Sequence, residues 1–229
     1  MAIFVLADLH LSLSVNKPMT VFEGWDDYVP RIEQQWQRLV GEGDTIILVG
    51  DTSWALQLSE TERDFAFIHS LPGHKIVVRG NHDYWWNTKV KLVNWVEDMG
   101  FTSIRFLFNN SYVAEGLGIV GTRGWFYDSE DAHDEKILNR ELGRLRLSIE
   151  SLDASSCDSV TAFLHYPPVY RDFVVAPVLE VLHEYGITRC YYGHLHGQSH
   201  AHACIGEYEG IDMQLVSADY LAFTPMKIQ

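Results

Sequence analysis

Residues 78–86 read VRGNHDYWW, and the interpretation of the whole chain starts from this stretch. It begins as the end of an apolar strand, breaks at Gly80, and continues with an amide, an imidazole and a carboxylate. A turn requires the glycine and accepts the asparagine, but it requires neither His82 nor Asp83 nor the aromatic residues that follow. The segment is therefore a candidate functional site at the end of a strand.

The same arrangement recurs along the chain, because most predicted strands end in residues that bind metal ions. Apolar or β-branched runs predict strands at 3–7, 45–49, 75–78, 160–164 and 188–192. The polar residues that follow these strands are Asp8, His10, Asp51, Asn81, His165, His194 and His196. Ligands of α/β proteins bind beyond the carboxyl ends of the strands, so these side chains can converge on one point.

These side chains suit a centre of two metal ions. They provide two carboxylates, one amide oxygen and four imidazoles, which is more than one tetrahedral zinc ion uses. Mixed nitrogen and oxygen ligands favour Mn, Fe, Zn, Co or Ni over Ca or Mg. Because side chains alternate along a strand, Asp8 and His10 should point to the same side, as should His194 and His196 if that segment is extended.

Each of these patterns alone has a purely structural explanation. A single Asp-x-His is a weak signal, Gly50-Asp51 is typical of a turn or helix cap, and a lone His165 is typical of a core or loop. The joint occurrence, in order and after hydrophobic strands, favours the metal centre over these explanations. The other histidines fit no part of the pattern, and we expect His200 and His202 at ordinary strand positions.

Helical patterns lie between the first three strands. One helical face is formed by Val29, Ile32, Trp36, Leu39 and Val40. Ser59 and Glu62 predict a capping box for a second helix, which Pro72-Gly73 should end. Strands and helices that alternate in this way predict a parallel sheet covered by helices.

The second half predicts a further group of strands and helices. Short strands are expected within 116–124, a helix near 177–185, and an antiparallel ending from 200–206 and 210–217. A long helix carries an apolar stripe of Leu138, Leu142, Leu145, Ile149 and Leu152. This stripe should face the core and not a dimer partner, since it covers only about two heptads. The fold class is therefore mixed α/β, with two packed sheets and helices outside.

Composition limits the classes of protein and partner. The 229 residues suit a single domain, and the apolar fraction of 47% is typical of a globular protein. A formal charge of −14 disfavours long nucleic acid and anionic membranes. Three dispersed cysteines, an N-terminus without a basic signal region, and the absence of a long apolar run lead us to expect a cytoplasmic protein.

The motifs together resemble the calcineurin-like metallophosphoesterase superfamily. The ordered blocks are DLH (8–10), GD (50–51), GNHD (80–83), His165 and GHLH (193–196). The resemblance implies a four-layer α-β-β-α fold, and it implies hydrolysis of a phosphomono- or phosphodiester by direct attack of a metal-bridging hydroxide. The expected substrate is a small phosphorylated metabolite or nucleotide. The alternatives are a nuclease for short or single-stranded nucleic acid, and a non-catalytic metal-binding scaffold.

The resemblance also implies roles for individual residues. One metal ion would be held by Asp8, His10, Asp51 and His196. Asp51 would bridge to a second ion held by Asn81, His165 and His194. His82 would contact phosphate and assist the leaving group, with Asp83 orienting it. The RGNHD block matches protein phosphatases only in part, so protein phosphatase activity is not expected.

The residues around these blocks suggest where a substrate would lie. Trp54 follows the GD block at a position where relatives often have a carboxylate, and Trp85-Trp86 follow GNHD. These aromatic residues, like 125–127 and Tyr166, could stack on a nucleobase or an apolar leaving group; alternatively they pack under the loops. Arg123 could bind a second phosphate group or form a surface salt bridge. Oligomeric state, native metals and substrate are left open by the sequence.

Overall fold

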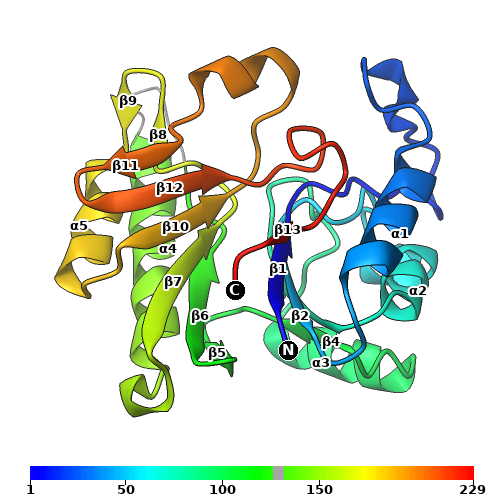
Figure 1. The fold of residues 1–229 in the computed structure, drawn as a ribbon, viewed down its shortest axis with the longest axis horizontal. Coiled ribbons are helices and arrows are strands. Elements are labelled where there is room, and N and C mark those ends of the chain that lie inside the picture. Colours follow the sequence, from blue (N-terminus) through cyan, green and yellow to red (C-terminus); the bar gives the residue numbers. More distant parts are fainter. Residues whose placement is uncertain (126–131) are drawn as a thin grey trace.

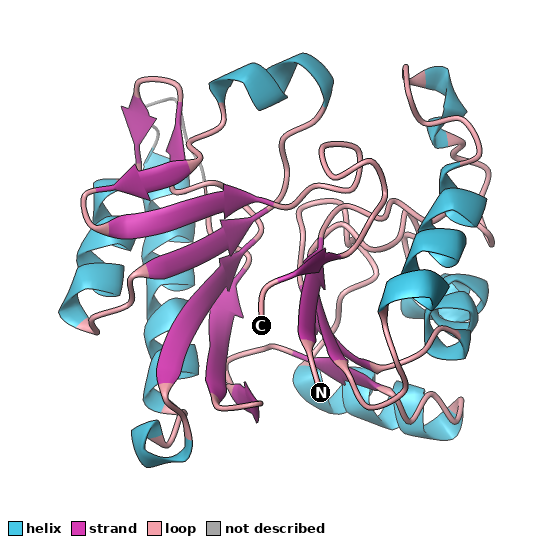
Figure 2. Cartoon of the chain, in the orientation of Figure 1, coloured by secondary structure: helices cyan, strands magenta, loops and turns pink. Residues whose placement is uncertain are grey.

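The computed structural model describes residues 1–125 and 132–229, and it has two large sheets that pack face to face between helices (Figures 1 and 2). The first sheet has the strand order β13 (Met226–Lys227), β1 (Ile3–Leu6), β2 (Thr45–Val49), β3 (His74–Val78) and β4 (Ile104–Phe106). Its strands are parallel except β13. The expected four-layer arrangement of two mixed sheets flanked by helices is confirmed.

The second sheet has the order β11 (Gly206–Tyr208), β12 (Ile211–Leu215), β10 (Arg189–Tyr192), β7 (Ser159–Leu164), β6 (Leu117–Thr122) and β5 (Tyr112–Ala114). Its four central strands are parallel, and the two edge strands are antiparallel to their neighbours. A separate small hairpin consists of β8 (Val169–Tyr170) and β9 (Phe173–Val174).

Side-chain alternation along the strands creates the layers. In β1 and β2, Val5 and Ile47 face the other sheet, where they pack in the cluster that contains Phe163. Leu6 and Leu48 point to the opposite side and pack with the helices of the first half. Those helices are α1 (Tyr28–Leu39), α2 (Glu62–Ser70) and α3 (Lys89–Asp98). The outer face of the second sheet is covered by α4 (Ala132–Glu150) and α5 (Ala176–Glu184) (Figure 1). The strands of the two sheets thus end along one common edge of the molecule.

The apolar stripe of α4 faces the core, as predicted. Leu138, Leu145 and Ile149 are buried in the cluster of the second sheet, and Leu142 and Leu152 pack against it. None of the helices in the described part of the chain is long and apolar enough to cross a bilayer.

Three local predictions were wrong. The capping box joins Gln57 and Glu60 at the short 3-10 helix η2 (Leu58–Thr61), not Ser59 and Glu62, because this turn precedes α2. Leu39 is exposed, since α1 ends there and the chain turns away. The segment with His200 and His202 is the 3-10 helix η4 (Gly197–His202), so only β11 contributes an antiparallel strand there. The remaining 3-10 turns are η1 (Met19–Val21) and η3 (Ala154–Ser156).

Candidate metal centre

The predicted metal ligands converge where the carboxyl ends of both sheets meet. They lie in the loops that follow β1, β2 and β3 of the first sheet and β7 and β10 of the second. Asp8, His10, Asp51 and His165 are buried, with at most 2% of each residue exposed. Burial of so many ionisable groups is unfavourable unless they pair or bind a cation, so their convergence itself indicates a metal site.

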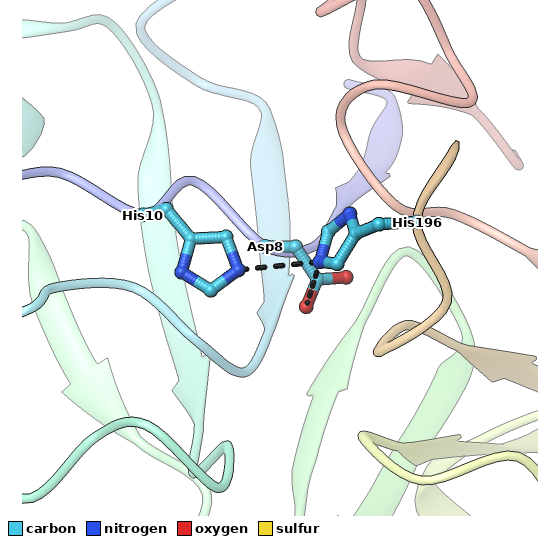
Figure 3. Close-up of side chains that lie close together, drawn as sticks. All are labelled: Asp8, His10 and His196. Atoms are coloured by element: carbon cyan, nitrogen blue, oxygen red, sulfur yellow. Dashed lines mark hydrogen bonds and ion pairs between the residues drawn. The ribbon is translucent and has the colours of Figure 1, made fainter. Parts of the chain in front are cut away.

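One group of ligand atoms comes from the first and last blocks (Figure 3). His10 Nε2 lies 3.2 Å from His196 Nε2, and His196 Nε2 lies 3.7 Å from Asp8 Oδ1. The ligand atoms of these three residues all lie within 4.8 Å of one another. Two imidazole nitrogens and a carboxylate oxygen that face one point form a suitable set for a transition-metal ion.

A second group of candidate ligand atoms lies beside it. Asn81 Oδ1 is 2.6 Å from His165 Nε2 and 2.9 Å from His194 Nδ1. His165 Nδ1 lies 3.1 Å from the carbonyl oxygen of Val49, which fixes the ring so that Nε2 faces the centre. A candidate group of Asp8, Asp51 and His165 again lies within 4.8 Å.

Asp51 has the geometry of a bridging ligand. Its Oδ1 accepts a hydrogen bond of 2.7 Å from the backbone N–H of His82. Its Oδ2 lies 3.8 Å from His10 Nε2 and 3.5 Å from His165 Nε2, which belong to the two different groups. One carboxylate oxygen thus faces both sets of ligands.

The electrostatics of the centre also favour cations. Burial, and then the charge of Asp8, raise the pKa of Asp51 well above its usual range. Asp8 Oδ1 and His10 Nδ1 are buried without a hydrogen-bond partner in the described part of the chain. Divalent ions would offset the repulsion between the two carboxylates and provide a partner for Asp8 Oδ1. The residues therefore fit a two-metal centre.

The backbone at these ligands is strained. Asp8, His10, Asp51 and His194 have φ angles of 59°, 45°, 49° and 73°, a region that residues other than glycine seldom adopt. Each such residue costs on the order of 1–3 kcal/mol, and strain of this kind is concentrated at functional sites. Strands that ended in ordinary turns would not require positive φ angles at these positions.

Asp219 belongs to the centre and was missed by sequence reasoning. Its Oδ1 lies 2.9 Å from His196 Nδ1, and its Oδ2 accepts a hydrogen bond of 3.0 Å from the backbone N–H of Gly197. His200 Nε2 lies 3.3 Å from the same carboxylate. Burial lowers the pKa of His196, but the neighbouring carboxylates of Asp219 and Asp8 outweigh this effect and raise the pKa to about 10. No motif marks Asp219, because it follows β12 in an irregular loop.

His82 lies at the rim of the centre, whereas Asp83 lies beneath it. Burial lowers the pKa of His82 to about 4. Asp83 accepts hydrogen bonds from the backbone of Thr52 (2.9 Å) and Gly80 (2.7 Å) and from Trp85 Nε1 (3.0 Å). Within the described residues His82 Nδ1 has no hydrogen-bond partner, so the direct orienting bond expected from Asp83 is not present. Asp83 instead connects the GD loop to the GNHD loop through its hydrogen bonds with Thr52 and Gly80.

A cavity of about 710 Å³ opens beside His10, His82 and His196. Trp54 lines it and stacks on His10, with ring centroids 4.8 Å apart and planes at 22°. Sequence reasoning missed Trp25, Met19 and Phe22, which also line the cavity and come from the segment before α1. The only signal for them is their position after the first block.

Trp85, Trp86 and Arg123 lie away from this cavity. Trp85 is 1% exposed and packs on Phe65, with centroids 5.1 Å apart. Trp86 is 8% exposed, and Arg123 pairs with Glu141 at 3.3 Å. Of the two alternatives that the sequence left open for these tryptophans, the structure has the packing one, because both are buried in the core under the GNHD loop. Residues 126–127 lie outside the described residues.

Comparisons with known proteins show the family and the fold. The family model described as calcineurin-like phosphoesterase matches residues 1–198. The crystal structure of phosphopantetheinyl hydrolase (PptH) from Mycobacterium tuberculosis is 16% identical, with a TM-score of 0.58 over 99% of this chain and 95% of that one. The protein of unknown function AQ665 from Aquifex aeolicus is also 16% identical, with a TM-score of 0.54 over the same shares.

TT1561 of Thermus thermophilus is 11% identical, with a TM-score of 0.56 over 99% of this chain and 97% of that one. Identities this low show a common fold alone. A search of curated proteins found no match.

Proposed function

Because the chain belongs to the calcineurin-like phosphoesterase family, we propose that it uses two metal ions to hydrolyse a small phosphomonoester or phosphodiester. Phosphoester hydrolysis is the chemistry of the family, and the two-metal centre is our extension of it to this chain. The observation that carries the proposal is the position of Asp51 Oδ2 between His10 Nε2 and His165 Nε2. A single carboxylate oxygen in that position suits a ligand shared by two ions.

The residues divide between the two ions as the family motif implies. The first would be held by Asp8, His10, Asp51 and His196, and the second by Asp51, Asn81, His165 and His194. When bound, such ions supply Lewis acidity toward phosphoryl oxygens and a water molecule acidic enough to act as nucleophile near neutral pH. Nitrogen and oxygen ligands favour Mn, Fe, Zn, Co or Ni.

His82 is the proposed catalytic side chain of the protein itself. It lines the cavity beside His10 and His196, where a phosphate group bound at the centre would lie. Its low pKa makes the imidazole neutral at pH 7, and a neutral imidazole still carries one N–H that can donate to a phosphoryl or leaving-group oxygen. His82 thus offers a hydrogen-bond donor beside the proposed ligands.

The cavity favours a small substrate with an apolar or flat leaving group. Trp54, Trp25 and Met19 form apolar walls next to the ligands. The formal charge of −14 opposes the approach of long nucleic acid. A mononucleotide, a cyclic nucleotide or another small phosphorylated metabolite fits both properties.

Hydrolysis assays with a panel of substrates test the proposal. The protein is loaded in turn with Mn, Fe, Co, Ni or Zn and mixed with p-nitrophenyl phosphate, bis-p-nitrophenyl phosphate, cyclic nucleotides and single-stranded DNA. We expect hydrolysis of at least one small ester and little cleavage of the DNA. Absence of turnover with every metal would favour a metal-binding scaffold, and preferential cleavage of DNA would favour a nuclease.

The variant His82→Ala tests the catalytic assignment. Removal of a transition-state hydrogen-bond donor should lower kcat by about 100-fold or more. Metal content, measured by elemental analysis, should stay the same because His82 is not one of the proposed ligands. If kcat and metal content fall together, His82 is a ligand or a structural residue and not the catalyst.

A further inference from the structure

A second, small cavity lies on the far side of the GNHD loop and is lined by three arginines. Arg79 follows β3, Arg123 follows β6, and Arg144 lies in α4. Trp86 and Glu141 also line it. We refer to these five residues as the arginine pocket. It contains Arg123 and Trp86, two residues that sequence analysis singled out and the metal centre does not use.

Positive charge in the arginine pocket exceeds negative charge. Glu141 is 2% exposed and is its one carboxylate. Arg144 Nη1 lies 2.6 Å and Arg123 Nη2 3.3 Å from Glu141 Oε1. Glu141 Oε2 accepts a hydrogen bond of 2.7 Å from the hydroxyl of Thr122. Within the described residues the carboxylate thus contacts two arginines and a threonine, and Arg79 is not among these partners.

Several N–H donors of the pocket are buried without an acceptor. Among the described residues, Arg79 Nε, Arg123 Nε and Trp86 Nε1 have no hydrogen-bond partner. Trp86 is 8% exposed, so its indole N–H cannot rely on bulk water. Unpaired buried donors are unfavourable, and more so when two of them carry positive charge. An occupant that only accepts hydrogen bonds and bears negative charge would satisfy all three.

We propose that the arginine pocket binds one small monatomic anion, with chloride as the first choice. The cavity measures about 10 Å³, which is roughly the space of one water-sized particle. A complete phosphate group does not fit into this space, and a water molecule would not offset the excess of guanidinium charge. In a protein with a formal charge of −14, a local site of this kind requires the concentrated positive charge that the three arginines provide.

The site would stabilise the loop that carries the metal ligand Asn81. Arg79 directly precedes Gly80 and Asn81, so an ion that holds its guanidinium also holds the start of the GNHD loop. The backbone carbonyl of Arg123 accepts a hydrogen bond of 2.9 Å from the N–H of Tyr166, next to the ligand His165. This role is structural and does not depend on whether the protein hydrolyses phosphoesters.

Crystals soaked in bromide provide the direct test. Bromide replaces chloride and scatters anomalously, so we expect an anomalous peak in contact with the Nε atoms of Arg79 and Arg123 and the Nε1 of Trp86. A water molecule in that position, with no anomalous signal, would overturn the proposal.

Thermal unfolding in solution tests the same site. Sodium gluconate is exchanged for sodium chloride at constant ionic strength, and Tm is followed. At tenfold the Kd for chloride, Tm should rise by about 3–6 °C. The variant Arg79→Gln should lose this rise, as should the gentler Trp86→Phe in part, while Arg105→Gln, at an exposed arginine in β4, should keep it. Equal chloride dependence in all the variants, or a larger rise with inorganic phosphate than with chloride, would refute a monatomic anion site.

Discussion

At the scale of single residues, His196 is held from both sides of its ring. Its Nε2 faces Asp8 and the metal centre, and its Nδ1 is bound by Asp219 at 2.9 Å. Carboxylates that bind the outer nitrogen of a metal-ligating histidine fix its tautomer and increase its basicity. Asp219 would therefore position His196 for the proposed first metal ion, although it would touch neither the ion nor the substrate.

The variant Asp219→Ala should bind metal about 10–100-fold more weakly than the wild-type protein. Asp219→Asn should recover part of the affinity, because its amide oxygen can still accept the hydrogen bond from Nδ1. Competition with a chelator measures both constants, and Asp172→Asn, in the exposed hairpin between β8 and β9, is the control. Equal affinity for Asp219→Ala and the control would show that the carboxylate does not position His196.

Trp54 and Trp85 follow two adjacent motifs but have different roles. Trp54 lines the cavity, so Trp54→Ala should raise KM for p-nitrophenyl esters by about tenfold, which corresponds to about 1.4 kcal/mol of lost stacking. Trp85→Phe should leave KM unchanged but lower the free energy of unfolding by about 1–3 kcal/mol, because Asp83 loses its hydrogen bond from the indole. Steady-state kinetics and urea unfolding separate the two effects. A larger change in KM for Trp85→Phe than for Trp54→Ala would contradict this assignment.

At the scale of elements, strands and their ends were predicted well because the signal is local. Each ligand from Asp8 to His196 lies directly after an apolar run, and the sheet brings these ends together. Asp219 was not predictable in this way, since the loop after β12 reaches His196 only through the tertiary fold. His200 and His202 alternate as in a strand, yet their segment turns at Gly197, where φ is 53°, and forms η4.

Lys75 links α2 to the first sheet and gives a pH-dependent stability. It is 1% exposed at the start of β3, and its ammonium group binds the carbonyl of Leu71 at the C-terminal end of α2. Burial lowers the pKa of Lys75 from 10.5 to about 8. Between these two values the unfolded chain holds a proton that the folded chain has released, so stability rises with pH across this window.

The comparison of wild type with Lys75→Met isolates this contribution. From pH 8 to pH 10.5 the free energy of unfolding of the wild type should increase relative to the variant by up to about 3 kcal/mol. Urea titrations at several pH values measure the difference, and Lys89→Met, at an exposed position in α3, controls for general charge effects. A difference that is constant or falls with pH would mean that Lys75 is not desolvated in the folded protein.

At the scale of the whole molecule, the candidate metal centre lies at the junction of the two sheets. Asp8, Asp51 and Asn81 come from loops of the first sheet, and His165 and His194 from loops of the second. The alternation of predicted strands with helices indicated two packed sheets. Because neighbouring strands pair in parallel, the motifs that follow them meet at one edge. The cavity wall of Trp25, Met19 and Phe22 could not be predicted, because it comes from a segment with little regular structure whose position depends on packing against the finished fold.

Bound metal should therefore stabilise the packing of the two sheets, in addition to its proposed role in hydrolysis. For each ion present at 100 times its Kd, removal by a chelator should cost about 2.7 kcal/mol and lower Tm by about 5–11 °C. The variant Asp51→Asn should lose part of this metal-dependent stabilisation, so that chelator lowers its Tm less than that of the wild type. It should also unfold at a higher temperature than the metal-free wild type, because it removes a buried carboxyl group whose pKa is raised first by burial and then by the charge of Asp8. Differential scanning calorimetry measures all four states. A wild-type Tm that changes neither with chelator nor with added metal would contradict a metal centre that joins the sheets.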